Sequence, residues 1–323
     1  MIEFRLVRLW ASVPFPACPA SCWRGRDAII PGYAFEGRGS PVVEQSRDAA
    51  GLDVSRPNPG RIYDWFLGGT AHWAIDRIFG ERLMGMWPQI AGVARQNRAF
   101  LRRAVLDAYD AGIRQFLDLG SGIPTMGNVH EILQDHADEP VRVVYVDCEP
   151  VAAAHTRVKL QDVEWAGVVQ EDLLNWREVL DDCATQRLLD LNQPVCLLAV
   201  SVLQFIGPDG DVPGVLRRYA GKLAAGSRIA VTHFASDVPD PQARAAMERF
   251  RTECDVTPNP LWLRDRPTLT AWFEGIGEDW RLLGPGVAQL PEYRPDMITC
   301  PEDVAESEKM RPYAWYAISE KTR

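Results

Sequence analysis

The segment FLDLGSGIP, residues 116–124, constrains the fold of this chain more than any other. A short apolar run at 116–119 leads directly into a Gly-x-Gly turn, the pattern expected where a buried strand gives way to a helix. Gly120 and Gly122 have no Cβ, so a ligand can lie against their backbone. Ligands of open α/β sheets bind at this carboxyl edge of the strands. The segment therefore predicts a ligand site at the end of a first strand.

The rest of the chain alternates between strand and helix patterns. Strands are expected at 116–119, 141–146, 167–169, 195–202 and 226–234, and helices at 93–112, 128–136, 150–160, 174–188 and 212–223. This alternation predicts a doubly wound, Rossmann-like α/β sheet that is mostly parallel. Two later strands, at 279–283 and 314–318, flank a Pro-rich stretch at 284–312 and predict an antiparallel terminal strand. Helices are expected at 241–254 and 267–273.

The N-terminal part divides into two regions by composition. Residues 1–55 mix Pro, Gly, Arg and Ser without periodicity and predict an irregular leader; a cleaved signal peptide is the less favoured alternative. Residues 56–91 predict a helical cap, with one short helix that ends at Gly68-Gly69 and a second at 75–86. Residues 92–323 form the predicted ligand-binding domain.

Charge and hydropathy exclude several classes of protein. The net charge is −9, which works against nonspecific binding to nucleic-acid phosphates. The chain holds no run of about 18 or more apolar residues, so we expect no membrane span. Its seven cysteines are scattered without zinc spacing and predict free thiols, a cytoplasmic location and no metal site.

The turn after the first strand departs from a dinucleotide-binding fingerprint. That fingerprint needs a third glycine three residues after Gly122, where this chain has Thr125. Asp118, just before the glycines, would be a poor neighbour for a phosphate but suits a cationic amino group or a sulfonium. A ligand without a pyrophosphate therefore fits better.

Two further acidic positions follow predicted strands. Asp147 ends the run VVYVD, where a carboxylate can accept hydrogen bonds from both hydroxyls of a ribose; the alternative is that it caps the next helix. Asp172, in the segment QEDL, could accept from the exocyclic amine of adenine, and Leu173 would form an apolar wall for the base. The alternative for QEDL is a polar loop.

The motifs LDLGSG, VVYVD and QEDLL, in this order and spacing, resemble class I S-adenosylmethionine-dependent methyltransferases over about residues 92–320. A narrower resemblance, to a bacterial subfamily called the S-adenosyl methyltransferase family, begins near Arg56. It rests on the segments RPNPGRIYDWFLGG, ARQNRAFLRRAV, QFLDLGSGIPTMGNVHE, VVYVDCEPVAAAH and EYRPD. The resemblance implies S-adenosylmethionine as cofactor and leaves the substrate unassigned. It places Asp118, Gly120, Ser121 and Gly122 at the methionine side, Asp147 at the ribose, and Asp172 with Leu173 at the adenine.

The resemblance extends to the predicted cap. RIYDWFLGG is similar to a cap that closes over the cofactor, with Tyr63, Asp64, Gly68 and Gly69 as its distinctive members. A plain helix with its C-cap explains the same residues equally well. For Arg95, Asn97 and Arg98, an exposed basic face is preferred over contact with the cofactor carboxylate.

Catalytic residues are expected at the carboxyl end of the strand at 195–202. No Asn/Asp-Pro-Pro-Tyr element stands there, which disfavours the exocyclic amines of nucleic-acid bases and glutamine as substrates. Gln204 lies there, but an amide cannot take a proton, so its role as a base is in doubt. His233 and Tyr63 are further candidates, and His233 is also explained as a hydrogen-bonded structural residue.

These observations predict an S-adenosylmethionine-dependent methyltransferase that acts on a small-molecule acceptor and needs no membrane or nucleic-acid partner. The first alternative is a binding or regulatory protein that keeps the cofactor site without catalysis. The second is an NAD(P)-dependent oxidoreductase, which Thr125 disfavours.

Overall fold

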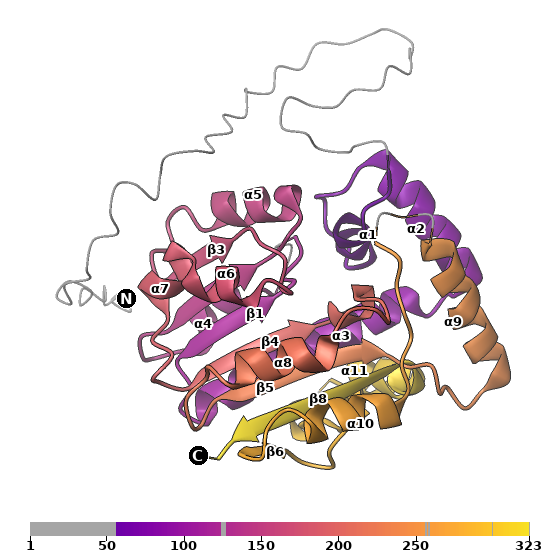
Figure 1. Ribbon diagram of the computed structural model, residues 1–323. Coiled ribbons are helices and arrows are strands. Elements are labelled where there is room, and N and C mark those ends of the chain that lie inside the picture. Colours follow the sequence, from indigo (N-terminus) through magenta and orange to yellow (C-terminus); the bar gives the residue numbers. More distant parts are fainter. Residues whose placement is uncertain (1–55, 124–126, 256, 258, 299, 323) are drawn as a thin grey trace, which may run out of the picture.

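The core of the computed structural model is one twisted sheet (Figure 1). The structure describes residues 56–322 apart from 124–126, 256, 258 and 299. Within that part, the sheet has eight strands in the order β3-β2-β1-β4-β5-β8-β6, and β7 pairs with β8. The strands are β1 (Gln115–Leu119), β2 (Arg142–Val146), β3 (Ala166–Val169), β4 (Val195–Val200), β5 (Arg228–Phe234), β6 (Trp280–Leu282), β7 (Ala288–Gln289) and β8 (Ala314–Lys321).

Strand direction follows the predicted pattern. β3, β2, β1, β4 and β5 are parallel, whereas β8 runs antiparallel between β5 and β6, from the pair Arg228↔Glu320 to Phe234↔Ala314. All five residues of β1 are buried, as expected for a strand covered on both faces. The doubly wound α/β fold and its antiparallel terminal strand are therefore confirmed.

Helices cover both faces of the sheet (Figure 1). The long helix α3 packs on α4, α11, β4 and β5. On the other face, α8 contacts both α6 and α10. α7 and α5 pack on β3. The bounds of these helices are α3 (Ile90–Asp110), α4 (Val129–His136), α5 (Pro150–Lys159), α6 (Trp176–Asp181), α7 (Cys183–Leu188), α8 (Val212–Ala220), α10 (Arg266–Glu274) and α11 (Pro301–Met310).

The N-terminal cap consists of α1 (Pro59–Phe66) and α2 (Ala74–Met86), with α9 (Pro241–Cys254) packed beside α2 (Figure 1). Asn58 starts α1 because its side chain accepts the N–H groups of Gly60 and Arg61, and Pro59 needs no N–H partner there. Gly68, at φ +78°, turns the chain after the helix.

Buried polar groups join the two cap helices. Arg61 Nε lies 2.7 Å from Asp76 Oδ2, and both side chains are buried. Asp64 Oδ2 accepts the N–H of Ala71 at 2.9 Å and lies 3.0 Å from His72 Nδ1. RIYDWFLGG thus encodes more than a helix and its C-cap, because its Arg and Asp fix the path of the chain between α1 and α2.

One expectation was wrong in the second half of the chain, and the elements of another stretch were not predicted. The helix expected at 174–188 is broken at Asp182, which adopts an extended conformation and accepts the N–H of Ala184 as the N-cap of α7. The Pro-rich stretch at 284–312 contains α11 and β7, which the sequence pattern did not indicate. α11 is mostly polar and lies close to α3 because Gly92 leaves room for the side chain of Met310.

The EYRPD motif, residues 292–296, anchors the connection between β7 and β8 to α3. Tyr293 Oη donates to Asp107 Oδ2 at 2.7 Å, and Arg294 forms an ion pair with the same carboxylate. The buried Arg103 donates to the carbonyl groups of Tyr293 and Leu290 at 2.8 and 2.9 Å. This stretch therefore holds β8 against α3 rather than contributing to a ligand site.

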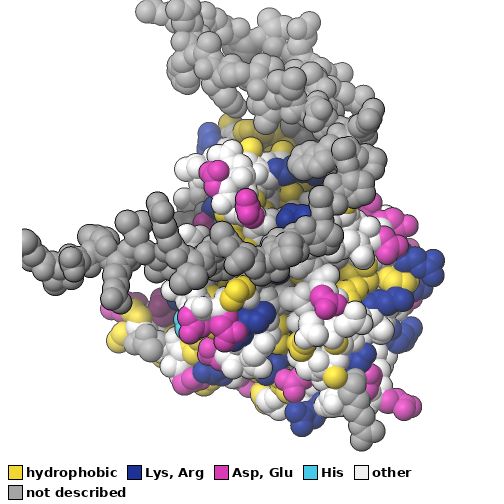
Figure 2. Space-filling model, turned by 90° about the vertical axis from the view of Figure 1, so that its left-hand side faces the viewer, with side chains coloured by type: hydrophobic (Ala, Val, Ile, Leu, Met, Phe, Trp, Pro, Cys, Tyr) yellow, Lys and Arg dark blue, Asp and Glu magenta, His cyan; other side chains and the backbone are white. Residues whose placement is uncertain are grey.

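Lys, Arg, Asp and Glu side chains are interspersed on the described surface that Figure 2 shows. None of the described helices has the length and apolarity needed to cross a membrane. The predicted leader, residues 1–55, lies outside the described residues.

We expect Phe116→Ala to lower the free energy of unfolding by about 3–5 kcal/mol, because it opens a cavity at the centre of β1, where Phe116 is fully buried. Ile78→Ala, on the exposed face of α2, is the control and should change it by less than about 0.5 kcal/mol. Urea unfolding of the three proteins measures both values, and equal losses would contradict this placement of the core.

Candidate functional site

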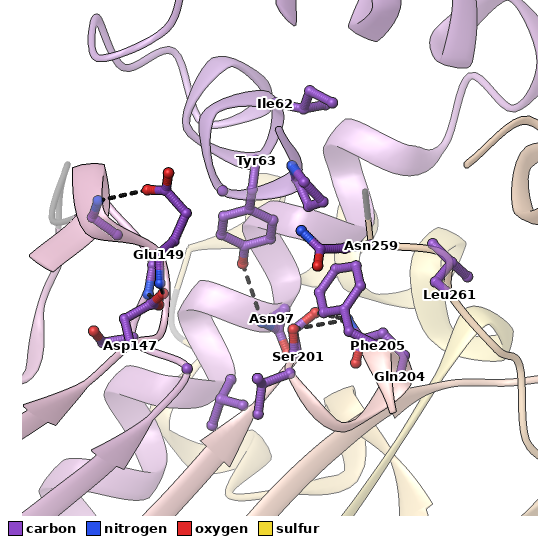
Figure 3. A pocket seen from close by; sticks show the side chains of 18 of the residues that line it. Ile62, Tyr63, Asn97, Asp147, Glu149, Ser201, Gln204, Phe205, Asn259 and Leu261 are labelled. Atoms are coloured by element: carbon purple, nitrogen blue, oxygen red, sulfur yellow. Dashed lines mark hydrogen bonds between the residues drawn. The ribbon is translucent and has the colours of Figure 1, made fainter. Parts of the chain in front are cut away.

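A cavity of about 440 Å³ lies between the carboxyl ends of the strands and the helical cap. This volume is within the range of about 300–1,000 Å³ typical of small-molecule sites. In Figure 3, Asp147 and Glu149 lie on one side of the space beneath Tyr63, and Ser201, Gln204 and Phe205 lie on the other. All the predicted site residues line this cavity: Tyr63, Asp118, Gly120, Ser121, Gly122, Asp147, Asp172, Leu173, Gln204 and His233.

The two glycines of the turn serve different purposes. Both have positive φ values, +67° at Gly120 and +66° at Gly122. A Cβ at Gly120 would lie 2.1 Å from Val202 Cγ2, so this glycine allows the ends of β1 and β4 to touch. A Cβ at Gly122 would meet no atom of the described residues within 4 Å. Gly122 thus leaves room for a ligand.

Asp147 links the glycine turn to the end of β2. Its Oδ2 accepts the N–H of Gly122 at 2.7 Å, and its Oδ1 accepts the N–H of Glu149 at 2.9 Å. Each oxygen keeps a further lone pair for a ligand. The N-cap of α5 is Glu149, not Asp147, so capping does not explain the acid. Burial raises the pKa of Asp147, which favours a ligand that donates hydrogen bonds to it.

The residues after β3 form the edge of the same cavity. Asp172 is exposed, and its Oδ1 accepts the N–H of Leu174 at 2.9 Å, so it also shapes the loop. Leu173 is buried at 8% exposure. The polar loop and the apolar wall that the sequence suggested therefore both exist at this place.

Asp118 is the most strongly shifted acid of the site. Burial raises the pKa of its carboxyl to about 7, while the nearby Arg98 opposes the shift. A cationic group placed beside Asp118 would favour its ionised form. This is the environment expected for the amino group or sulfonium of a ligand.

The basic face expected at Arg95, Asn97 and Arg98 is present only in part. Arg95 is exposed and pairs with Glu306. Asn97 is buried and Arg98 lines the cavity, so the expectation was wrong for these two. The Arg98 guanidinium lies 5.7 Å from the centre of the Tyr63 ring, and its buried Nε has no hydrogen-bond partner in the part of the chain that the structure describes.

Tyr63 joins the cap to the sheet through a chain of hydrogen bonds. Its hydroxyl donates to the carbonyl of Ala94 and accepts from Asn97 Nδ2, both at 3.1 Å. Asn97 Oδ1 accepts from Thr232 Oγ1 at 2.6 Å. The Tyr63 hydroxyl is thus already bonded at both its proton and its oxygen.

His233 is a hydrogen-bonded residue in this structure. Nδ1 lies 2.9 Å from the carbonyl oxygen of Phe234, so it carries the proton, and Nε2 accepts from Arg264 at 2.9 Å. Burial lowers the pKa of His233 to about 3. Neither ring nitrogen is free to take a proton from a substrate.

The residues present fit an adenosyl sulfonium ligand. Open space faces Gly122, and the buried Ser121 Oγ, like Arg98 Nε, has no partner among the described residues. Carboxylates stand at the ends of β1, β2 and β3, where an amino group, a ribose and an adenine amine would each find an acceptor.

Comparison with known proteins identifies the family. The sequence model of the S-adenosyl methyltransferase family matches residues 45–319. The chain belongs to this family. The match begins at residue 45, upstream of the start near Arg56 that the sequence motifs indicated. Family membership gives S-adenosylmethionine as the cofactor, and it leaves the oxidoreductase alternative without support.

Two solved structures share this fold at similar identity. One, a putative methyltransferase from Thermobifida fusca YX, is 30% identical with a TM-score of 0.74 and covers 84% of this chain and 98% of that one. The other, a DUF574 family protein from Streptomyces avermitilis MA-4680, is 31% identical with a TM-score of 0.73 and covers 83% and 99%. A search of curated proteins returned no match.

Sequence reasoning missed one wall of the cavity. Phe79 and Leu83 come from α2, Phe250 and Cys254 from α9, and Leu261 from the loop after it. Their helical spacing indicated a buried face, but nothing in the pattern indicated that α2 and α9 lie side by side over the strand ends.

The two glycines should respond differently to alanine. Gly120→Ala is expected to lower the free energy of unfolding by about 2 kcal/mol more than Gly122→Ala. Both substitutions place alanine in a left-handed conformation, but only Gly120→Ala also creates a clash, with Val202. Gly122→Ala should fold yet bind S-adenosylhomocysteine roughly tenfold more weakly, since its methyl occupies ligand space. Urea unfolding and calorimetry measure these effects; equal stability losses would contradict the assignment.

Asp118 should make stability depend on pH. The folded protein keeps this proton up to about pH 7, whereas the unfolded chain releases it near 3.8, the ordinary pKa of an aspartate, so the contribution of Asp118 to stability falls as pH rises between the two. Without ligand, Asp118→Asn should be more stable than wild type by up to about 4 kcal/mol at pH 8 and by about 2 kcal/mol at pH 5. A difference that does not vary with pH in urea unfolding would contradict this titration.

Proposed function

We propose that the protein is an S-adenosylmethionine-dependent methyltransferase acting on a small-molecule acceptor. The observation that carries the proposal is that one cavity joins the carboxylates at the ends of β1, β2 and β3 to an apolar space beneath the cap. A methyl donor and an acceptor can therefore meet inside it, away from water.

Each end of the cofactor has a matching group in this arrangement. Asp118 would hold the amino group and Arg98 the carboxylate of the methionine part. Asp147 would accept from the ribose hydroxyls, Asp172 from the adenine amine, and Leu173 would contact the base. When bound, the cofactor supplies a methyl group already activated by its sulfonium, so the protein's task is alignment and the exclusion of water.

The helical cap and the charges on the surface favour a small-molecule acceptor over a nucleic acid. α1 and α2 lie over the strand ends, so the cavity is a partly covered pocket rather than an open groove for a duplex. The described surface in Figure 2 carries charges of both signs, and the chain has a net charge of −9. These features support a neutral or small ligand that enters the cavity.

A cofactor-binding regulator is the second candidate. It is favoured by one observation: His233, near the end of β5, and Tyr63, on α1 of the cap, already have their polar atoms hydrogen-bonded. Methyl turnover with a metabolite extract separates the two functions, because a regulator would bind the cofactor without turnover.

The cofactor site is tested by thermal shift with S-adenosylmethionine, S-adenosylhomocysteine and NADH. At a hundredfold excess over Kd, a ligand that binds only the folded state adds about 2.7 kcal/mol, a shift of several degrees. We expect both adenosyl ligands to shift wild type and not Asp147→Ala, which loses the acceptor for ribose.

Asp162→Ala is the matched control, since Asp162 is exposed and lies outside the cavity lining. It should respond like wild type. A wild-type shift with NADH alone, or no shift with the adenosyl ligands, would contradict the proposed function.

A further inference from the structure

The chain has a strained residue directly after β4, the strand whose end should face the methyl acceptor. Ser201 has φ +61°, a left-handed conformation that is uncommon for residues other than glycine. Its N–H donates to Thr232 Oγ1 at 2.9 Å, and Thr232 in turn donates to Asn97. Such strain persists where surrounding contacts hold it, and it concentrates at functional sites.

The strained turn fixes the side chain of Gln204. Gln204 Nε2 donates to the carbonyl oxygen of Ser201 at 2.8 Å and to Ser201 Oγ at 2.7 Å. A carbonyl can only accept, so the amide nitrogen must face Ser201 and the amide oxygen must point elsewhere. The backbone carbonyl of Gln204 is also held, by the N–H of Trp262 at 2.8 Å.

This orientation leaves one buried acceptor unused at the cavity. Gln204 is 1% exposed and lines the cavity, and among the described residues its Oε1 has no hydrogen-bond partner. Buried polar atoms in folded proteins nearly always have partners, so an unpartnered one calls for an explanation. A hydrogen-bond donor on a bound ligand would supply the missing partner.

Apolar side chains, with Asn259 among them, line the cavity on the side of Gln204 (Figure 3). Phe66, Phe79 and Leu83 come from the cap, and Phe205, Phe234 and Phe250 come from the sheet side and α9. Every carboxylate among the described lining residues lies instead at the end of β1, β2 or β3. This part of the cavity therefore suits an uncharged, flat, apolar molecule.

No described group on this side is free to act as a base at neutral pH. Tyr63 and His233 are hydrogen-bonded as described above, and burial raises the pKa of Cys254 to about 12. An amide cannot take a proton either. The acceptor atom must then attack without first losing a proton, as the nitrogen of a neutral amine does.

We infer that the methyl acceptor is a neutral amine on a flat apolar body, and that Gln204 Oε1 accepts a hydrogen bond from its N–H. This inference rests on the proposed function and assigns Gln204 a positioning role rather than that of a base. The nitrogen lone pair forms the new N–C bond as the S–C bond breaks, and the electron pair of that bond stays on sulfur. The N–H proton is then released to water.

The test uses two probes of matching shape, 1-naphthylamine and 1-methylnaphthalene, which exchange an amino group for a methyl group. They are titrated by fluorescence against protein saturated with S-adenosylhomocysteine. Wild type should bind the amine about 5- to 150-fold more tightly, the factor that corresponds to about 1–3 kcal/mol for leaving a buried acceptor unpaired. Gln204→Met should abolish this preference.

Gln242→Met is the matched control, because Gln242 is exposed on α9 and outside the cavity lining; it should keep the wild-type preference. Wild type that binds the two probes equally, or binds neither, overturns the inference, as does a preference that survives in Gln204→Met. The wild-type comparison needs no variant, so it decides the point even if Gln204→Met does not fold.

S-adenosylhomocysteine binding is measured first on its own. Its absence in wild type contradicts the proposed function, whereas its presence without amine preference contradicts only the assignment of Gln204.

Discussion

The contact between Gly120 and Val202 is the constraint on which the rest of the site depends. It brings the end of β1 against the end of β4, so the cofactor residues and the residues after β4 border one space. No residue with a Cβ fits at Gly120 without displacing Val202. The bond from Gly122 N–H to Asp147 then fixes the same turn to β2, so three strand ends share one loop.

The cavity has two chemically different halves because different elements build them. Carboxylates lie at the ends of β1, β2 and β3, while the space beyond β4 is lined mostly by apolar side chains, with the amides of Gln204 and Asn259 among them. A charged, polar cofactor suits the first half, and an apolar molecule suits the second. The chain of hydrogen bonds from Ser201 through Thr232 and Asn97 to Tyr63 links the turn that orients the Gln204 amide to the cap.

The sequence predicted the sheet well because its strands are short apolar runs and its turns carry glycine. The glycine turn, Asp147 and Asp172 could be placed at one edge because carboxyl ends of parallel strands meet there. α11 escaped notice because its sequence is mostly polar, and the break at Asp182 because the capping bond to Ala184 competes with helix continuation. The free oxygen of Gln204 depends on the left-handed turn at Ser201, which residue types alone do not reveal.

α2 and α9 lie side by side and contribute apolar side chains to the cavity lining, whereas the carboxylates among the described lining residues lie at the ends of β1, β2 and β3. Under the proposed function, the residues for the methyl donor and this apolar wall are therefore encoded in separate stretches of the chain. Substitutions in the second can accumulate without loss of the first. Under the proposed function, a chain built in this way can change the molecule that it modifies while it keeps the same methyl donor.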